Sequence, residues 1–169
     1  MKKAMVILSG GQDSTTCLFW AKENYDEVSA ITFDYGQKHK IEIEAAKTIA
    51  KMAEVDHHIV EVPNILKSRS PLTNENEELE TYDNYDQMDK IIGDRVELTF
   101  VPMRNAFFIT LAANYALNVD CYTLVTGVCQ QDNANYPDCR ETFIKSQEKT
   151  INEALGIDNF KIVTPLINM

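Results

Sequence analysis

The run of residues best suited to chemistry is SGGQDST at positions 9–15, which directly follows a short apolar stretch. Glycines let a backbone approach a ligand closely, and the hydroxyls of Ser9, Ser14 and Thr15 can donate hydrogen bonds. If the run joins a strand to a helix, main-chain N–H groups and the positive end of the helix favour an anion above them. The run therefore predicts a phosphate-binding loop.

Two common phosphate-binding patterns do not fit these residues. No lysine follows the second glycine, as a Walker A loop requires, and the spacing is not that of GxGxxG. A structural interpretation also fits: Gly10 and Gly11 could form only a tight turn, with Asp13 as a helix cap. Because the whole string is more specific than two glycines, we favour the functional interpretation.

A basic cluster, Lys38-His39-Lys40, stands where a second helix is expected to begin. Cations at a helix start oppose the helix dipole, and such a local conflict can mark a functional site. These residues could bind a phosphate or a substrate carboxylate. A solvated basic patch explains them equally well.

Polar residues also follow later strands. Arg104 and Asn105 stand where a strand passes into a helix, and Arg104 could pair bidentately with a phosphate or carboxylate, or form a structural salt bridge. His57 and His58 open a strand and are expected to serve structure. A further loop could contact a substrate or hold Mg²⁺ through Asp132, Tyr136, Asp138 and Arg140.

Apolar runs alternate with helix-like segments along the chain, and this order predicts parallel strands covered by helices. We therefore expect an α/β fold, a Rossmann-like parallel sheet of about five strands with helices on both faces. Strands are expected at residues 4–8, 28–33, 57–62, 122–126 and 160–163. Helices are expected at residues 13–24, 38–53, 104–117 and 138–155. The candidate residues then meet at the carboxyl edge of the sheet.

Helical spacing also predicts which side chains face the core. The first helix should have an apolar side at Leu18, Phe19 and Ala21, and Cys17 and Cys121 should be buried. The second helix should bury one stripe, formed by Ile41, Ala45, Ile49 and Met52.

Residues 64–97 lack periodicity and are rich in Asp and Glu, which predicts an irregular acidic excursion from a single domain spanning residues 1–169. A functional lid and a disordered segment fit this stretch equally well. The net charge of −10 argues against a broad nucleic-acid surface. No apolar run approaches the roughly 20 residues that cross a bilayer, so we expect a cytoplasmic protein without a membrane partner. None of the four cysteines forms a CxxC pair, and reduced thiols are expected.

The string SGGxDS at the end of an N-terminal strand resembles the signature of the PP-loop ATP pyrophosphatases, with their adenine nucleotide alpha hydrolase-like fold. Further strings are similar to one family among them, the QueC family of 7-cyano-7-deazaguanine synthases in queuosine biosynthesis. The resemblance covers residues 3–166. The strings are FDYGQ at 33–37, FVPMRN at 100–105, TGVC at 126–129, YPDCR at 136–140 and TPL at 164–166.

The resemblance implies an ATP-dependent ligase that forms carbon–nitrogen bonds. It would convert 7-carboxy-7-deazaguanine and ammonia to the nitrile through adenylated intermediates, with Mg²⁺ as cofactor. Residues 33–36 would lie near the adenine and ribose, and Asp13 is a candidate Mg²⁺ contact. The implied catalytic residues are Asp13, Lys38, Arg104 and Asp132. The implied substrate-binding residues are Arg104, Asn105, Tyr136, Asp138 and Arg140. The implied ATP-binding residues are Leu8, Ser9, Gly10, Gly11, Gln12, Asp13, Ser14, Thr15, Thr16, Cys17 and Leu18.

Two features depart from the family pattern. The family usually has glycine at the position of Met103, so a side chain is expected near the mouth of the site. Family members also continue into a cysteine cluster that binds Zn²⁺, whereas this sequence ends at Met169 without those ligands. The resemblance also implies a homodimer, because members of the family are commonly homodimers.

Two alternatives are a PP-loop enzyme that modifies tRNA and an ATP-binding module without catalysis. The acidic charge and the lack of CxxC pairs speak against the first, and a tRNA gel shift at physiological salt would separate them. The missing C-terminal region is the feature that favours the second.

Overall fold

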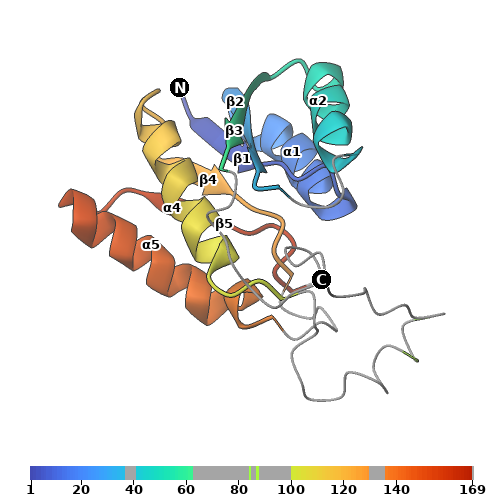
Figure 1. The fold of residues 1–169 in the computed structure, drawn as a ribbon. Coiled ribbons are helices and arrows are strands. Elements are labelled where there is room, and N and C mark those ends of the chain that lie inside the picture. Colours follow the sequence, from blue (N-terminus) through green and yellow to red (C-terminus); the bar gives the residue numbers. More distant parts are fainter. Residues whose placement is uncertain (37–40, 63–83, 85–86, 88–99, 130–135, 169) are drawn as a thin grey trace.

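A computed structural model describes residues 1–36, 41–62, 84, 87, 100–129 and 136–168. Its centre is a five-stranded sheet in the order β3-β2-β1-β4-β5, in which every neighbouring pair is parallel (Figure 1). The strands are β1 (Lys3–Ile7), β2 (Glu27–Asp34), β3 (Asp56–Glu61), β4 (Thr123–Val125) and β5 (Lys161–Val163). The chain steps outward from β1 to β3 and then returns to the other side of β1. The predicted five-stranded parallel sheet is confirmed.

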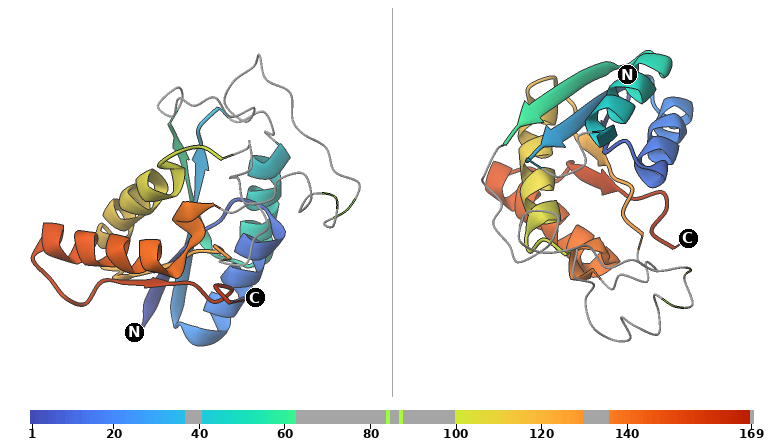
Figure 2. Two further views of the ribbon diagram at one scale, coloured as in Figure 1. Left: turned by 90° about the horizontal axis from the view of Figure 1, so that it is seen from below. Right: turned by 45° about the vertical axis from the view of Figure 1, so that its right-hand side comes forward.

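Helices cover both faces of the sheet, as predicted. The helices α1 (Gln12–Asn24) and α2 (Ile41–Met52) lie on one face, and α4 (Arg104–Leu117) and α5 (Glu141–Leu155) lie on the other (Figures 1 and 2). A short 3₁₀ helix, η1 (Pro137–Cys139), precedes α5. The predicted helix from residue 138 therefore begins three residues later, at Glu141. It ends where expected, at Leu155, and is capped by Gly156, whose φ of +67° is the left-handed conformation typical of a C-terminal cap.

Each face of the sheet has its own core, because alternate residues of a strand point to opposite faces. Met5 and Ile31 pack with α4 and α5, whereas Val6 and Leu8 pack with α1 and α2. Since both faces are covered, β1 reads as a continuous apolar run. The predicted burial of Cys17 is confirmed, and so is that of Cys121.

The predicted buried stripe of α2 is wrong at its two ends, whereas Ile49 packs partly buried against the core and Ala45 is half-buried. The helix buries Ile43, Ala46 and Ala50, while Ile41 is 76% exposed and Met52 is 72% exposed. The buried face of α2 combines Ile43 with two small residues, Ala46 and Ala50, and the exposed Ile41 and Met52 lie at the two helix ends. In α1, Leu18 and Ala21 are buried as predicted, but Phe19 is 43% exposed.

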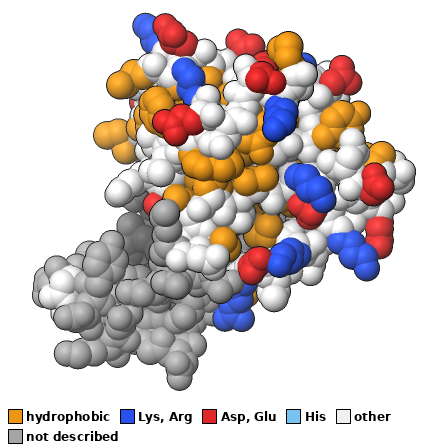
Figure 3. All heavy atoms as spheres, turned by 180° about the vertical axis from the view of Figure 1, so that it is seen from behind, with side chains coloured by type: hydrophobic (Ala, Val, Ile, Leu, Met, Phe, Trp, Pro, Cys, Tyr) orange, Lys and Arg blue, Asp and Glu red, His pale blue; other side chains and the backbone are white. Residues whose placement is uncertain are grey.

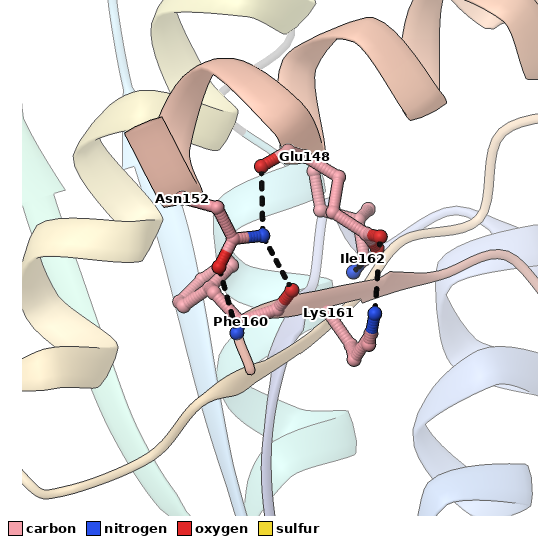
Figure 4. A network of polar contacts seen from close by, with 5 residues as sticks. All are labelled: Glu148, Asn152, Phe160, Lys161 and Ile162. Atoms are coloured by element: carbon pink, nitrogen blue, oxygen red, sulfur yellow. Dashed lines mark hydrogen bonds and ion pairs between the residues drawn. The ribbon is translucent and has the colours of Figure 1, made fainter. Parts of the chain in front are cut away.

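Side chains of α5 cover the free edge of β5 (Figure 4). The Asn152 amide donates from Nδ2 to the Phe160 carbonyl at 2.9 Å and accepts the Phe160 N–H at 3.0 Å. Glu148 Oε2 accepts the Ile162 N–H at 2.7 Å, and Glu148 Oε1 lies 3.5 Å from Lys161 Nζ. These contacts take the place of a neighbouring strand, because the backbone of an edge strand otherwise has unpaired polar groups.

On the face opposite to Figure 1, acidic and basic side chains are interspersed around a small apolar area (Figure 3). In the part of the chain that the structure describes, no helix has the length and apolar character needed to cross a membrane. The predicted acidic excursion at residues 64–97 lies outside the described residues, apart from Asn84 and Gln87.

Candidate functional site

The loop after β1 is held by hydrogen bonds between its own residues. Ser14 Oγ lies 3.2 Å from the Ser9 N–H, 3.0 Å from Ser9 Oγ and 3.1 Å from the Gly11 carbonyl. Ser9 Oγ in turn accepts the Gly11 N–H at 3.3 Å. One assignment satisfies every group: Ser14 donates to Gly11, and the Ser9 hydroxyl donates to Ser14. These hydroxyls therefore shape the loop, and Ser14 is 6% exposed.

The loop leads directly into the N-terminus of α1. Gly11 is the N-cap, with φ −79° and ψ 169°, and no side chain caps the helix. Thr15 donates from both its N–H and its hydroxyl to the Gly11 carbonyl, at 3.1 Å and 2.7 Å. The first N–H groups of a helix have no partner within it, and they carry its positive dipole end. This arrangement can bind an anion such as a phosphate group.

Three glycines around this loop differ in what a side chain would meet. A Cβ on Gly10, whose φ is +89°, would lie 2.3 Å from the Glu42 carbonyl oxygen in α2. A Cβ on Gly127, just after β4, would lie 2.9 Å from the backbone of Asp13. A Cβ on Gly11 would meet only Ser9 Oγ, at 3.5 Å. The fold therefore requires glycine at the first two positions, and space is left open at Gly11.

The eleven predicted ATP-binding residues differ in how far they are exposed. Leu8, Cys17 and Leu18 are 0% exposed, so their side chains belong to the core. Burial, with a smaller contribution from Asp13, raises the pKa of the Cys17 thiol to about 11, which keeps it protonated and unreactive. The exposed residues of the segment are Ser9, Gly11, Gln12, Asp13 and Thr16. Of the remaining three, Gly10 and Thr15 are half-buried and Ser14 is buried.

A second cluster forms where α4 begins beside η1. The Asn105 N–H donates to Asp138 Oδ2 at 3.3 Å, and Asn105 Nδ2 donates to the Asp138 carbonyl at 3.3 Å. Asn105 Nδ2 also lies 3.6 Å from Cys139 Sγ. The structure thus brings together Asn105 and Asp138, which are 33 residues apart in the sequence. Because the carboxylate meets the first turn of α4, it also complements the helix dipole.

Burial dominates the electrostatics of Asp138, which is 8% exposed. Loss of solvation raises the pKa of this carboxyl, and the Asn105 N–H and the charge of Arg104 oppose that rise. Arg104 is half-buried at the start of α4, and no carboxylate among the described residues lies within ion-pair distance of it. The positive charge of Arg104 can therefore pair with an anionic group of a ligand.

The remaining predicted residues are less closely grouped. Tyr136 packs against Phe100, with ring centroids 5.5 Å apart, and Arg140 is exposed at the N-cap of α5. Phe33, expected near the adenine, is 5% exposed and stacks on Phe108 with a centroid distance of 4.5 Å. Lys38, His39, Lys40 and Asp132 lie outside the described residues.

Met103 stands at the N-cap of α4 with φ +66°, the left-handed region that glycine adopts most easily. Its side chain is 68% exposed beside Arg104. The backbone conformation explains why glycine suits this position. That the Met103 side chain lies near the mouth of the substrate site stays a prediction.

Sequence reasoning missed two residues that support the loop. Gly127 belongs to the TGVC string, but no local pattern in the sequence indicates that it lies near the loop. In the structure it packs against the backbone of Asp13, which brings the end of β4 close to the start of α1. Thr32 is the other residue. A hydroxyl within the apolar run of β2 could have drawn attention to Thr32, because a buried polar group needs a hydrogen-bond partner.

Comparisons with known proteins identify the family of the chain. The family model "Queuosine biosynthesis protein QueC" matches residues 3–169. A protein of Lysinibacillus sphaericus named 7-cyano-7-deazaguanine synthase is 44% identical, over 98% of this chain and 72% of its own length. A protein of the same name from Clostridium botulinum is 43% identical, with the same coverage.

Solved structures support the fold. A 4-thiouridine synthetase in complex with RNA and bound ATP has a TM-score of 0.61 at 16% identity, covering 98% of this chain and 37% of that one. A predicted tRNA methyltransferase subunit from Methanocaldococcus jannaschii has a TM-score of 0.51 at 17% identity, covering 99% and 69%. With the family model matched over almost the whole chain, the protein belongs to the QueC family of queuosine biosynthesis.

Proposed function

We propose that this chain binds ATP on the loop after β1 and uses it to convert 7-carboxy-7-deazaguanine and ammonia to 7-cyano-7-deazaguanine. The observation that carries the proposal is the open space at Gly11 above an uncapped helix N-terminus. Family membership and relatives named 7-cyano-7-deazaguanine synthase supply the reaction.

The chemistry explains why ATP is needed. Ammonia does not displace oxide from a carboxylate, because oxide is a poor leaving group. The substrate carboxylate instead attacks the α-phosphate of ATP and releases pyrophosphate, giving an acyl adenylate. Ammonia attacks that carbonyl, AMP leaves with one substrate oxygen, and an amide forms. The amide oxygen then attacks the α-phosphate of a second ATP, which releases pyrophosphate and a proton, and loss of AMP and the second amide proton gives the nitrile.

The protein's part in these steps is positioning and charge stabilisation. The N–H groups at the start of α1 would bind the phosphates. The hydrogen bonds that Ser9 and Ser14 make to each other and to Gly11 would keep these N–H groups in place before ATP binds. Arg104 would bind the substrate carboxylate or a phosphate, a role supported by its lack of a carboxylate partner among the described residues. Asp138 would hold the first turn of α4, and so the backbone around Arg104, in place. Lys38 and Asp132 stay candidate catalytic residues.

Two metals follow from the family resemblance. Mg²⁺ would fit at Asp13, whose exposed carboxylate supplies a hard oxygen ligand next to the phosphate position, and would neutralise phosphate charge. Zn²⁺ does not fit the described residues, because they contain no group of three or more His, Cys, Asp or Glu side chains arranged to hold a metal. No step of the proposed reaction uses Zn²⁺.

The experiment is to incubate the chain with ATP, Mg²⁺, ammonium and 7-carboxy-7-deazaguanine, and to identify the products by mass. The proposal predicts AMP, pyrophosphate and the nitrile. ATP that stays bound with no AMP formed would indicate a binding module without catalysis. AMP formed only with tRNA would indicate a tRNA-modifying enzyme. The acidic net charge argues against this outcome, and on one face of the molecule both signs of charge are mixed (Figure 3).

A further inference from the structure

A chain of hydrogen bonds links β3 to the residue that enters the phosphate-binding loop. The Thr32 hydroxyl of β2 lies 2.5 Å from the Leu8 carbonyl oxygen and 2.7 Å from Nε2 of His57 in β3. Thr32 is 2% exposed, so water does not compete for these contacts. The three groups therefore connect β3 and β2 to the residue that directly follows β1.

The direction of each hydrogen bond follows from the available protons. The Leu8 carbonyl can only accept, so the single proton of the Thr32 hydroxyl goes to Leu8. Thr32 must then accept from His57, which places the His57 proton on Nε2. Burial, followed by the charges of His58 and Lys47, lowers the pKa of His57, so the ring favours its neutral form. In that form the ring holds a single proton, and the hydrogen bond to Thr32 requires it on Nε2.

We call the hydrogen bonds that run from His57 through Thr32 to Leu8 the Thr32 relay. The residue that this relay holds, Leu8, is the last one bonded to β2 before the loop begins. The β1–β2 pairing ends at Ile7 and Ile31, and the Leu8 N–H still donates to the Ile31 carbonyl at 2.9 Å. With Thr32 bonded to its carbonyl, Leu8 is tied to β2 through both of its backbone polar groups. Ser9, the next residue, begins the hydrogen-bond network of the loop.

We propose that Thr32 is a positioning residue for the phosphate-binding loop and that His57 positions Thr32. The inference rests on the proposed ATP site. Binding energy is lost when N–H groups must reorganise around a ligand, and a fixed Leu8 carbonyl limits how far Ser9 and Gly10 can shift. The role lies outside the chemistry itself, because neither side chain reaches the exposed part of the loop.

The first test is a pair of substitutions at one position. Thr32→Val removes the hydroxyl at nearly constant shape, whereas Thr32→Ser keeps it. We expect Thr32→Val to weaken ATP binding about tenfold, as for a lost buried hydrogen bond with an orphaned acceptor, and Thr32→Ser to restore it to within about threefold of wild type. Asn152→Ala, which destabilises β5 away from the loop, serves as the control for loss of stability alone and should leave ATP affinity unchanged.

The second test is a double-mutant cycle. His57→Leu removes the donor to Thr32, and His57→Gln retains an N–H donor at similar reach. If His57 acts through Thr32, the double variant Thr32→Val with His57→Leu binds ATP no more weakly than Thr32→Val alone. Additive losses would refute the relay.

The outcomes separate this inference from the ATP site itself. Thr32→Val with unchanged ATP affinity, measured by equilibrium dialysis, would overturn the positioning role while wild-type binding stands. No ATP binding by the wild-type chain would instead overturn the proposed function, and the positioning role would fall with it.

Discussion

Gly10 and Glu42 are in contact so close that a Cβ on Gly10 would lie 2.3 Å from the Glu42 carbonyl oxygen. The neighbouring Gly11 has no such contact, since its Cβ would meet only Ser9 Oγ at 3.5 Å. Two adjacent glycines of one motif therefore have different reasons to be glycine. Gly10 lets the loop pack on α2, and Gly11 leaves space for a ligand.

This difference predicts opposite results for two alanine substitutions. Gly10→Ala should lower the free energy of unfolding by about 3 kcal/mol, because it combines a backbone clash with a positive φ. Gly11→Ala should lower it by only about 0.5 kcal/mol, as for a changed N-cap, yet weaken ATP binding about tenfold. Urea unfolding and equilibrium dialysis measure the two quantities. Equal stability losses would show that Gly11 is also a packing glycine.

Met103 should be replaceable by glycine with a gain in stability. Its φ of +66° is unfavourable for a residue with a Cβ. Relief of that strain exceeds the added freedom of glycine in the unfolded chain, so Met103→Gly should raise the unfolding free energy by about 0.5 kcal/mol. Urea denaturation is the measurement.

Gly156 offers the matched control, because it has φ +67° and a Cβ added to it would have no atom within 4 Å. Gly156→Ala should lower the unfolding free energy by about 1 kcal/mol, the reverse of the change at Met103. If Met103→Gly instead destabilises the protein, contacts of the Met103 side chain outweigh the backbone strain.

The contacts of α5 on β5 should contribute measurably to stability. Asn152→Ala leaves the Phe160 N–H and carbonyl without their partner, which should cost about 2 kcal/mol of unfolding free energy. Thr150→Ala on the same helix removes only a hydroxyl bonded within the helix, and should change stability by less than about 0.5 kcal/mol. A loss of stability in Thr150→Ala but not in Asn152→Ala would contradict the role given to the Asn152 hydrogen bonds drawn in Figure 4.

The lowered pKa of His57 predicts how stability depends on pH. A folded-state pKa below the unfolded value of about 6.5 means that the unfolded chain binds more protons as the pH falls. The contribution of His57 is therefore complete above about pH 6.5 and is lost as the pH falls toward its folded-state pKa. His57→Gln, which does not titrate, should show a smaller stability loss between about pH 7.5 and 5.5. Identical losses in the two proteins would assign the effect to other groups.

The sequence predicts the succession of strands and helices and the loop, but not every packing surface. The strands at residues 4–8 and 28–33 are predictable because apolar runs between turn signals are a strong pattern. The face of α2 was predicted wrongly at Ile41 and Met52, because these large apolar residues lie exposed at the helix ends while the smaller Ala46 and Ala50 are buried. Hydrophobicity alone does not report how near a helix approaches a sheet.

The site was predictable to a similar degree. The string SGGQDST identified the loop, but the separate roles of Gly10 and Gly11 depend on where α2 lies. The contact between Asn105 and Asp138 joins segments that no local pattern relates. The Thr32 relay likewise depends on the register of β2 against β3, in which Ala30 pairs with His57.

The most direct test of the central claim follows the oxygen atoms of the substrate. With 7-carboxy-7-deazaguanine carrying ¹⁸O in its carboxylate, each adenylation transfers a substrate oxygen to AMP. The account predicts that mass spectrometry finds one ¹⁸O in the AMP formed, together with unlabelled pyrophosphate. Unlabelled AMP, or ADP with labelled phosphate, would contradict activation of the substrate by adenylation.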